Sequence, residues 1–346
     1  MIHTLLLFLV FAAITWMAGI WLTRTTDAID AKYKLGSAFG GLLILGVTTS
    51  LPEISVAVSA AFQHHYGIII GTLVGGIAMQ TVVISFLDAR MKDRVSLSFD
   101  AASLTLVVEA AVVILVTVAA ILAVRTPVVL PHTDVSLTSL LIFVLWLGGL
   151  WLVYHIRKGL PWRAEALAGN PGREHHERSK AINHPSMKRA SNARVFGILG
   201  VASLATLLAG FGLQVTGNTL AGDWHIGSGL FAATFIAFAG ALPNISTGFA
   251  SIDIGDYKLA MSDIFGGNAF MPALFIVCDL VAGHPVLQHA TASDIWFAAI
   301  GVLVTSIYII SLIVRPKRIF LRMGIDSIAV LCLYIFGVIV LTVTGG

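Results

Sequence analysis

The residues best suited to chemistry lie in the stretch Gly46–Ser55, which reads Gly-Val-Thr-Thr-Ser-Leu-Pro-Glu-Ile-Ser. Glu53 is the only ionisable residue in an apolar run that extends from about Leu35 to Phe62. A charge near the middle of a membrane is costly, so such a residue normally faces a partner or a water-filled path. The stretch therefore predicts a polar site inside a membrane.

Pro52 adds backbone oxygens to this site. Proline has no N–H, and its ring disturbs the carbonyl one turn earlier, at Thr48. The freed carbonyls, the hydroxyls of Thr48, Thr49 and Ser50, and the Glu53 carboxylate are oxygen ligands of the kind that a hard cation prefers. The structural alternative is a proline kink whose glutamate is satisfied by a neighbouring helix.

The same stretch occurs a second time. An offset of 191 residues places Leu51–Ser55 on Leu242–Ser246, with Asn244 in the place of Glu53. The offset also matches glycine and polar positions, namely Gly36-Ser37 with Gly227-Ser228, Tyr66 with Tyr257, Gly75-Gly76 with Gly266-Gly267, and Asp88 with Asp279. Such matches are far less common by chance than matches of apolar residues. They predict a duplicated half, which is typical of secondary transporters.

The composition agrees with a membrane protein: 57% of the residues are hydrophobic, 11% are charged, and the mean hydropathy is +0.92. Apolar spans of about 20 residues are expected to cross the bilayer. We predict an all-α fold of ten transmembrane helices near residues 2–23, 35–62, 66–88, 102–124, 136–156, 195–216, 227–252, 258–283, 294–314 and 323–345. The absence of ten-residue alternating segments excludes a transmembrane β-barrel.

Ten crossings divide into two inverted five-helix repeats, 1–156 and 195–346, joined by a cytoplasmic linker at 157–194. The repeated segments are 36–88 and 227–279. We expect Pro52 and Pro243 to break the second and seventh helices and to meet near mid-membrane.

This topology separates the charges. The odd-numbered loops hold 20 of the 21 Lys and Arg residues, which predicts that these loops are cytoplasmic and that both termini face outward across the plasma (inner) membrane. The segment 24–34 is then a solvated turn. The first span lacks the basic region and cleavage site of a signal peptide.

Two further polar positions lie on the third and eighth helices. Gly71 and Gly75 allow close helix approach, and Gln80 is a neutral ligand or an interhelical hydrogen-bonding residue. Asp263 lies one turn before Gly267, roughly 6 Å along the helix axis, where it serves either as a second charge on the path or as a structural residue.

The remaining histidine, cysteine and basic residues give weaker indications of function. The His64-His65 pair is either a metal-binding pair or an exposed turn. Cys278 and Cys332 read as small apolar residues within spans. No nucleic-acid motif accompanies the basic residues, and no His lies in the proline-containing helices to serve an intramembrane hydrolase.

The two proline segments, each followed by a small-residue helix, resemble the repeats of the cation/calcium exchanger superfamily, which includes sodium/calcium exchangers and proton-coupled relatives. The resemblance covers the whole chain. It implies ten helices, transported cations (Ca²⁺, Na⁺ or H⁺) with no separate cofactor, and cation ligands at Glu53, Thr49, Ser50 and Gln80. Asn268 remains from the family's polar pattern on the eighth helix.

The second repeat departs from the family. Asn244 occupies the position of the second glutamate ligand, so the metal position is held by Glu53 and Asn244 with one formal charge. Gly240, Ala241 and Gly267 replace hydroxyl residues, and Met271 replaces a polar one. A desolvated calcium ion is best matched by two or more carboxylates. One carboxylate with several amides fits a monovalent cation or proton–cation exchange better, with Asp263 as a possible second charge.

We therefore expect a cation antiporter that works by alternating access within a lipid bilayer. The alternative is a transport-inactive membrane scaffold or regulator that retains the exchanger fold. The oligomeric state is open.

Overall fold

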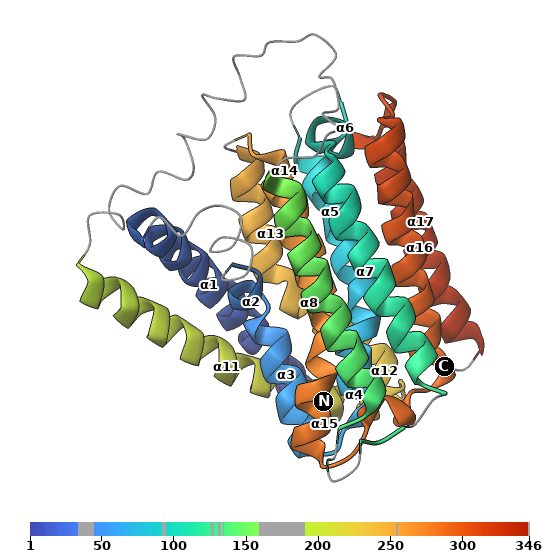
Figure 1. Ribbon diagram of the computed structural model, residues 1–346. Coiled ribbons are helices and arrows are strands. Elements are labelled where there is room, and N and C mark those ends of the chain that lie inside the picture. Colours follow the sequence, from blue (N-terminus) through green and yellow to red (C-terminus); the bar gives the residue numbers. More distant parts are fainter. Residues whose placement is uncertain are drawn as a thin grey trace.

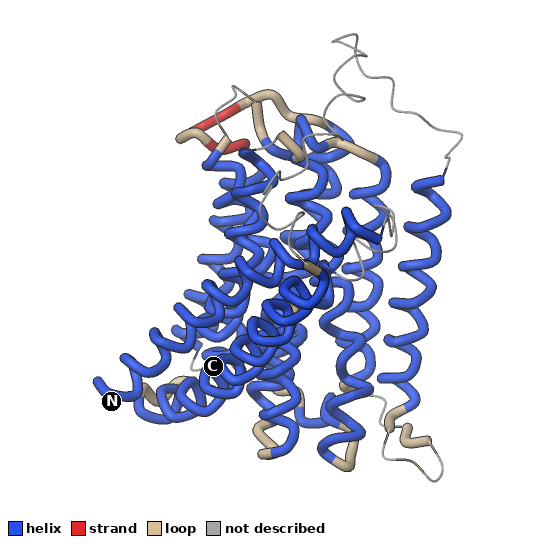
Figure 2. The backbone as a smooth tube through the Cα atoms, turned by 90° about the vertical axis from the view of Figure 1, so that its left-hand side faces the viewer, coloured by secondary structure: helices blue, strands red, loops and turns tan. Residues whose placement is uncertain are grey.

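The computed structural model describes residues 1–33, 45–91, 95–125, 128–130, 133, 135–158, 191–253 and 255–344. These residues form a bundle of helices with one small two-stranded hairpin (Figures 1 and 2). The elements of the first part of the chain are α1 (Ile2–Tyr33), α2 (Leu45–Thr49), α3 (Leu51–Phe62), α4 (Tyr66–Ile70), η2 (Gly71–Gly75), α5 (Gly76–Arg90), α6 (Leu97–Ala101), α7 (Leu104–Ala123) and α8 (Leu137–Lys158).

The remaining elements follow residue 191. They are α11 (Asn192–Asp223), α12 (Ser228–Phe231), η4 (Ala232–Ile236), α13 (Ala237–Asp253), α14 (Tyr257–Phe270), η5 (Met271–Leu274), α15 (Phe275–Ala282), η6 (Val286–His289), α16 (Ala292–Val314), β1 (Ile319–Phe320), β2 (Met323–Gly324) and α17 (Ile325–Thr344). Most of the predicted linker 157–194 and the segment 34–44, which includes Gly36-Ser37, lie outside the described residues.

Nine of the described helices are long and apolar enough to cross a membrane. They correspond to nine of the ten predicted spans, and the chain is an integral, multi-pass membrane protein. The second predicted helix, 35–62, is described only as α2 and α3, and the twelve-residue α3 is too short to count as a span by itself.

The predicted turn at 24–34 is wrong over its described residues, because α1 continues to Tyr33. The hydroxyls of Thr23, Thr25 and Thr26 donate to carbonyls three or four residues earlier, which makes these polar residues compatible with a helix. Beyond them, Ala28 and Ile29 are buried against Val195 of α11.

The two prolines behave differently. Ser50 forms a turn between α2 and α3, and Pro52 lies in the first turn of α3, as the predicted break requires. The predicted break at Pro243 is wrong, because α13 continues through it from Ala237 to Asp253. A proline removes one backbone N–H, and the helix tolerates this loss; the irregularity lies earlier, in the π-helical segment η4.

Helix α5 lies in the buried centre of the bundle, packed against α13, α14, α16 and α17. Helices α1 and α11 pack against each other along one flank of this core and are tilted relative to it (Figure 1). The predicted close approach at Gly71 and Gly75 is confirmed: a Cβ added at Gly75 would lie 2.5 Å from the Cβ of Ala233.

Each flanking helix crosses a proline segment at a glycine. A Cβ added at Gly19 of α1 would lie 2.5 Å from the Cβ of Pro243, and one added at Gly210 of α11 would lie 2.7 Å from the carbonyl oxygen of Pro52. Real Cβ atoms do not approach so closely, so both crossings require glycine. The two glycines are themselves 191 residues apart.

Two aspartates, also 191 residues apart, join helix ends at opposite ends of the bundle. Asp88 accepts hydrogen bonds from the backbone N–H groups of Leu97 (2.7 Å) and Gly324 (2.6 Å). Asp279 accepts from the N–H groups of Ser136 (3.1 Å) and Val286 (2.8 Å). Each carboxylate thus ties a core helix to two connecting segments.

The glycine crossings generate a stability prediction. Gly210→Ala should lower the thermal midpoint, because overpacking of this kind costs about 1–3 kcal/mol. Gly200→Ala in the same helix is the matched control: no described atom lies within 4 Å of its added Cβ, and alanine favours the helix. Equal midpoints for the two variants in detergent would contradict the close crossing.

Candidate functional site

Glu53 lies in the first turn of α3 and is 2% exposed. Its Oε1 accepts a hydrogen bond of 2.9 Å from Nε2 of Gln80 on α5. A Cβ added at Gly240 of α13 would lie 3.0 Å from the carboxyl carbon of Glu53. The carboxyl group therefore rests against helix backbone, where the missing side chain at Gly240 makes room for it.

Five buried side-chain oxygens in this region have no hydrogen-bond partner among the described residues. They are Oγ of Ser50, Oε2 of Glu53, Oε1 of Gln80, Oδ1 of Asn244 and Oδ1 of Asn268. Buried polar atoms are nearly always paired, so a group of unpaired ones requires an explanation. All five belong to residues that the sequence predicts as cation ligands.

The positions of these oxygens are linked through α13 and α14. A Cβ added at Gly267 would lie 3.5 Å from Oγ of Ser50 and 3.8 Å from Oε1 of Gln80, so both oxygens border the same point on α14. Asn244 lies one turn after Gly240 and shares its side of α13. One carboxylate, two amide side chains and a hydroxyl therefore converge from several helices.

Asn268 is joined to the same part of the core by its other atom. Its Nδ2 donates to Oγ1 of Thr81 at 3.1 Å, and Thr81 directly follows Gln80 on α5. The amide nitrogen of Asn268 is thus used in the hydrogen bond to Thr81, and its side-chain carbonyl oxygen remains available as an acceptor.

Asp263 is a second buried carboxylate, 8% exposed, with both oxygens engaged. Its Oδ2 accepts from Oγ1 of Thr247 at 2.8 Å, and its Oδ1 accepts from Oγ1 of Thr49 at 3.3 Å. Thr49 directly precedes Ser50, so this carboxylate is adjacent to the group around Glu53. It also links α14 to both α2 and α13.

Thr247 is a site residue that the sequence did not predict. Its match in the first half is Val56, so the repeat comparison offers no polar signal there. The position three residues after Asn244, on the same side of α13, is the signal that could have identified it. Met271, the position matching Gln80, is buried in η5 and adds no oxygen.

The other polar features lie elsewhere. Among the described residues, no group of three His, Cys, Asp or Glu side chains could hold a metal ion. His64 and His284 lie near Tyr66, and His65 contacts Gln214. Burial of the imidazole lowers the pKa of His289, and the neighbouring His284 lowers it further.

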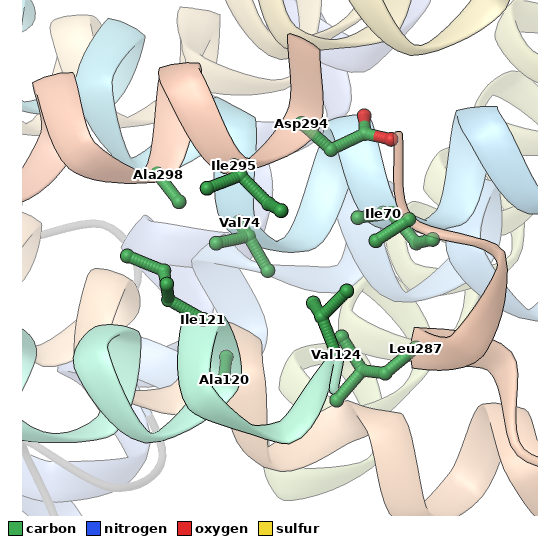
Figure 3. A pocket seen from close by; sticks show the side chains of 10 residues that line it. Ile70, Val74, Ala120, Ile121, Val124, Leu287, Asp294, Ile295 and Ala298 are labelled. Carbon is green, nitrogen blue, oxygen red and sulfur yellow. The ribbon is translucent and has the colours of Figure 1, made fainter. Parts of the chain in front are cut away.

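A small cavity lies between η2, α7, η6 and α16 (Figure 3). Its lining is apolar except for Asp294, whose Oδ2 accepts from the N–H and hydroxyl of Thr291 in a helix cap. The composition of this lining does not suit a cation.

Parts of the chain are similar to known exchanger and antiporter proteins. Residues 3–159 match the family described as "Sodium/calcium exchanger protein". The curated protein "Putative antiporter CaxA" of Alkalimonas amylolytica is 26% identical over 269 residues, which cover 77% of this chain and 76% of that protein.

Solved structures show the same fold. The H⁺/Ca²⁺ exchanger CAX superposes with a TM-score of 0.68 at 12% identity, covering 97% of this chain and 82% of that one. The sodium-calcium exchanger NCX_Mj superposes with a TM-score of 0.59 at 17% identity, covering 98% of each chain. The relatives are transporters, which sets this chain apart from enzymes. The match over residues 3–159 and the antiporter relative confirm the resemblance that the proline segments predict.

Proposed function

We propose that this protein is a secondary active antiporter that moves Ca²⁺ or a monovalent cation against Na⁺ or H⁺. The observation that carries the proposal is the group of five unpaired buried oxygens around Glu53 within the described core. A cation bound there would satisfy oxygens that are otherwise costly to bury. The named activities of CaxA, CAX and NCX_Mj support the same class of transport.

The charge of the site favours a monovalent cation or proton exchange over high-affinity calcium. Glu53 has the only carboxylate oxygen in the group, and Gln80, Asn244 and Asn268 contribute neutral oxygens. Asp263 already accepts two hydroxyl donors, which compete with a cation for its oxygens. Protonation of Glu53 would neutralise the group and release the cation, which supplies a simple means of coupling.

We propose alternating access between two inverted repeats, 1–156 and 195–346, as its mechanism. The paired roles of Asp88 with Asp279, and of Gly19 with Gly210, support the repeat because each pair is 191 residues apart. Helices α1 and α11 cross the site's proline segments at these glycines, so movement of this flanking pair would open or cover the site. The Lys and Arg distribution supports outward-facing termini.

A transport-inactive scaffold would have no reason to keep five acceptor oxygens buried. Flux in proteoliposomes with calcium, sodium, potassium and proton gradients tests the two functions. An ion that binds this site binds the native protein and not the unfolded chain. The thermal midpoint should therefore rise with the concentration of the transported ion.

Glu53→Gln should abolish counter-transport, because it removes the charge while preserving the side-chain shape. Proteoliposome flux under an imposed ion gradient is the measurement. Asp253→Asn, at an exposed carboxylate paired with Arg90, is the matched control and should transport normally. Flux close to wild type in a folded Glu53→Gln protein would remove Glu53 from the site.

Asn244→Glu should strengthen divalent binding by adding a second carboxylate. A gain of about 1.5–3 kcal/mol, the size of one charge-assisted contact, corresponds to roughly 10- to 150-fold tighter binding. Calcium titration by calorimetry is the measurement, with Asn218→Asp on α11 as a charge-matched control. If calcium affinity stays unchanged, position 244 is not a ligand.

The variants Gly240→Ala and Gly267→Ala should differ in their thermal stabilisation by the bound ion. The first forces the Glu53 carboxyl to move from a contact of 3.0 Å, whereas the second makes ordinary contacts of 3.5 and 3.8 Å. We expect ion-dependent thermal stabilisation to be lost in Gly240→Ala and kept in Gly267→Ala. The reverse result would show that the carboxyl does not occupy the position against α13.

A further inference from the structure

The connection between α16 and α17 is a tight antiparallel hairpin in which Ile319 pairs with Gly324 and Phe320 with Met323. Its two turn residues, Leu321 and Arg322, have positive φ values of 51° and 68°. Two-residue turns of this kind are normally built from Asn and Gly, because other side chains are strained there. The presence of a leucine and an arginine in this strained turn indicates that their side chains take part in an interaction.

The tip exposes apolar and basic side chains together. Phe320 is 62% exposed and Leu321 is 74% exposed. Arg318 and Arg322, also exposed, have no acidic partner among the described residues. The segment 315–325 contains four basic residues and no acidic one. We call residues 317–322 the hairpin tip.

The base of the hairpin is fixed to the bundle. Asp88 accepts from the N–H of Gly324, and Ser96 donates to the carbonyl of Pro316. Arg315 donates to the carbonyl of Phe99, and its guanidinium lies 4.6 Å from the centre of the Phe99 ring. The tip is therefore presented in a defined orientation.

Its position places the tip at the membrane surface. The spanning helix α16 ends at Val314, and α17 begins at Ile325, immediately after the hairpin. Figure 2 shows the two strands in red at one end of the bundle, and the hairpin directly connects α16 to α17. Phospholipid phosphates and the adjoining acyl chains meet at this depth, and basic residues beside a span attract acidic lipids.

We propose that the hairpin tip is a docking surface for acidic phospholipids. The guanidinium groups of Arg318 and Arg322 pair with headgroup phosphates, while Phe320 and Leu321 enter the adjoining acyl region. This interaction is separate from cation binding at Glu53 and does not rest on the proposed transport.

The first test compares Arg318→Gln/Arg322→Gln with the control Arg125→Gln/Lys258→Gln, which removes two exposed basic residues elsewhere, one just after α7 and one in the first turn of α14. The thermal midpoint of the purified protein is measured with added phosphatidylglycerol or phosphatidylcholine. We expect phosphatidylglycerol alone to raise the midpoint of the wild type and the control, to lose most of its effect in the hairpin variant, and to weaken at high salt. Equal rises in all three proteins would overturn the proposal, as would a rise reproduced by inorganic phosphate.

The second test reads the tip directly and remains informative if the arginine variant is unstable. An environment-sensitive fluorophore is attached at Leu321→Cys in a Cys332→Ser background, where the remaining Cys278 is buried. In vesicles containing phosphatidylglycerol the emission should shift to the blue relative to phosphatidylcholine vesicles. Identical, water-like emission in both would show that the tip does not enter the lipid and would overturn the proposal.

Discussion

The structure depends on accommodating one carboxylate, Glu53, in the apolar core of a membrane protein. An isolated charge there is costly, and none of the described residues around Glu53 has a cationic side chain. Gln80 instead holds one carboxylate oxygen, and Gly240 provides the space for the group. The other oxygen is buried with no hydrogen-bond partner among the described residues, an arrangement that favours an exchangeable cation or proton over a permanent ion pair.

This constraint also explains the difference between the two acids. Asp263 accepts hydrogen bonds from the hydroxyls of Thr49 on α2 and Thr247 on α13. These bonds hold its carboxylate in place and link α14 to both helices. Glu53 keeps an unsatisfied oxygen and is able to change its partner. Asn244 stands at the position that matches Glu53 in the repeat. The second negative charge of this region is therefore on Asp263, a carboxylate that is already hydrogen-bonded.

The central residues could be predicted because polar groups are conspicuous in apolar runs. Glu53, Pro52 and the 191-residue offset identify the region without coordinates. Thr247 could not be found in this way, because its match is Val56 and threonine is common in membrane helices. The continuity of α13 through Pro243 and the length of α1 depend on packing and on hydroxyl-to-backbone bonds, which the residue pattern does not report.

Anomalous diffraction from crystals soaked in Sr²⁺ or Tl⁺ tests the central claim most directly, because it locates a divalent or monovalent cation without reference to transport. The account predicts a peak bounded by Oε2 of Glu53 and the side-chain oxygens of Gln80, Asn244 and Asn268. Soaked crystals that show no peak there, or peaks only at surface carboxylates, would contradict it.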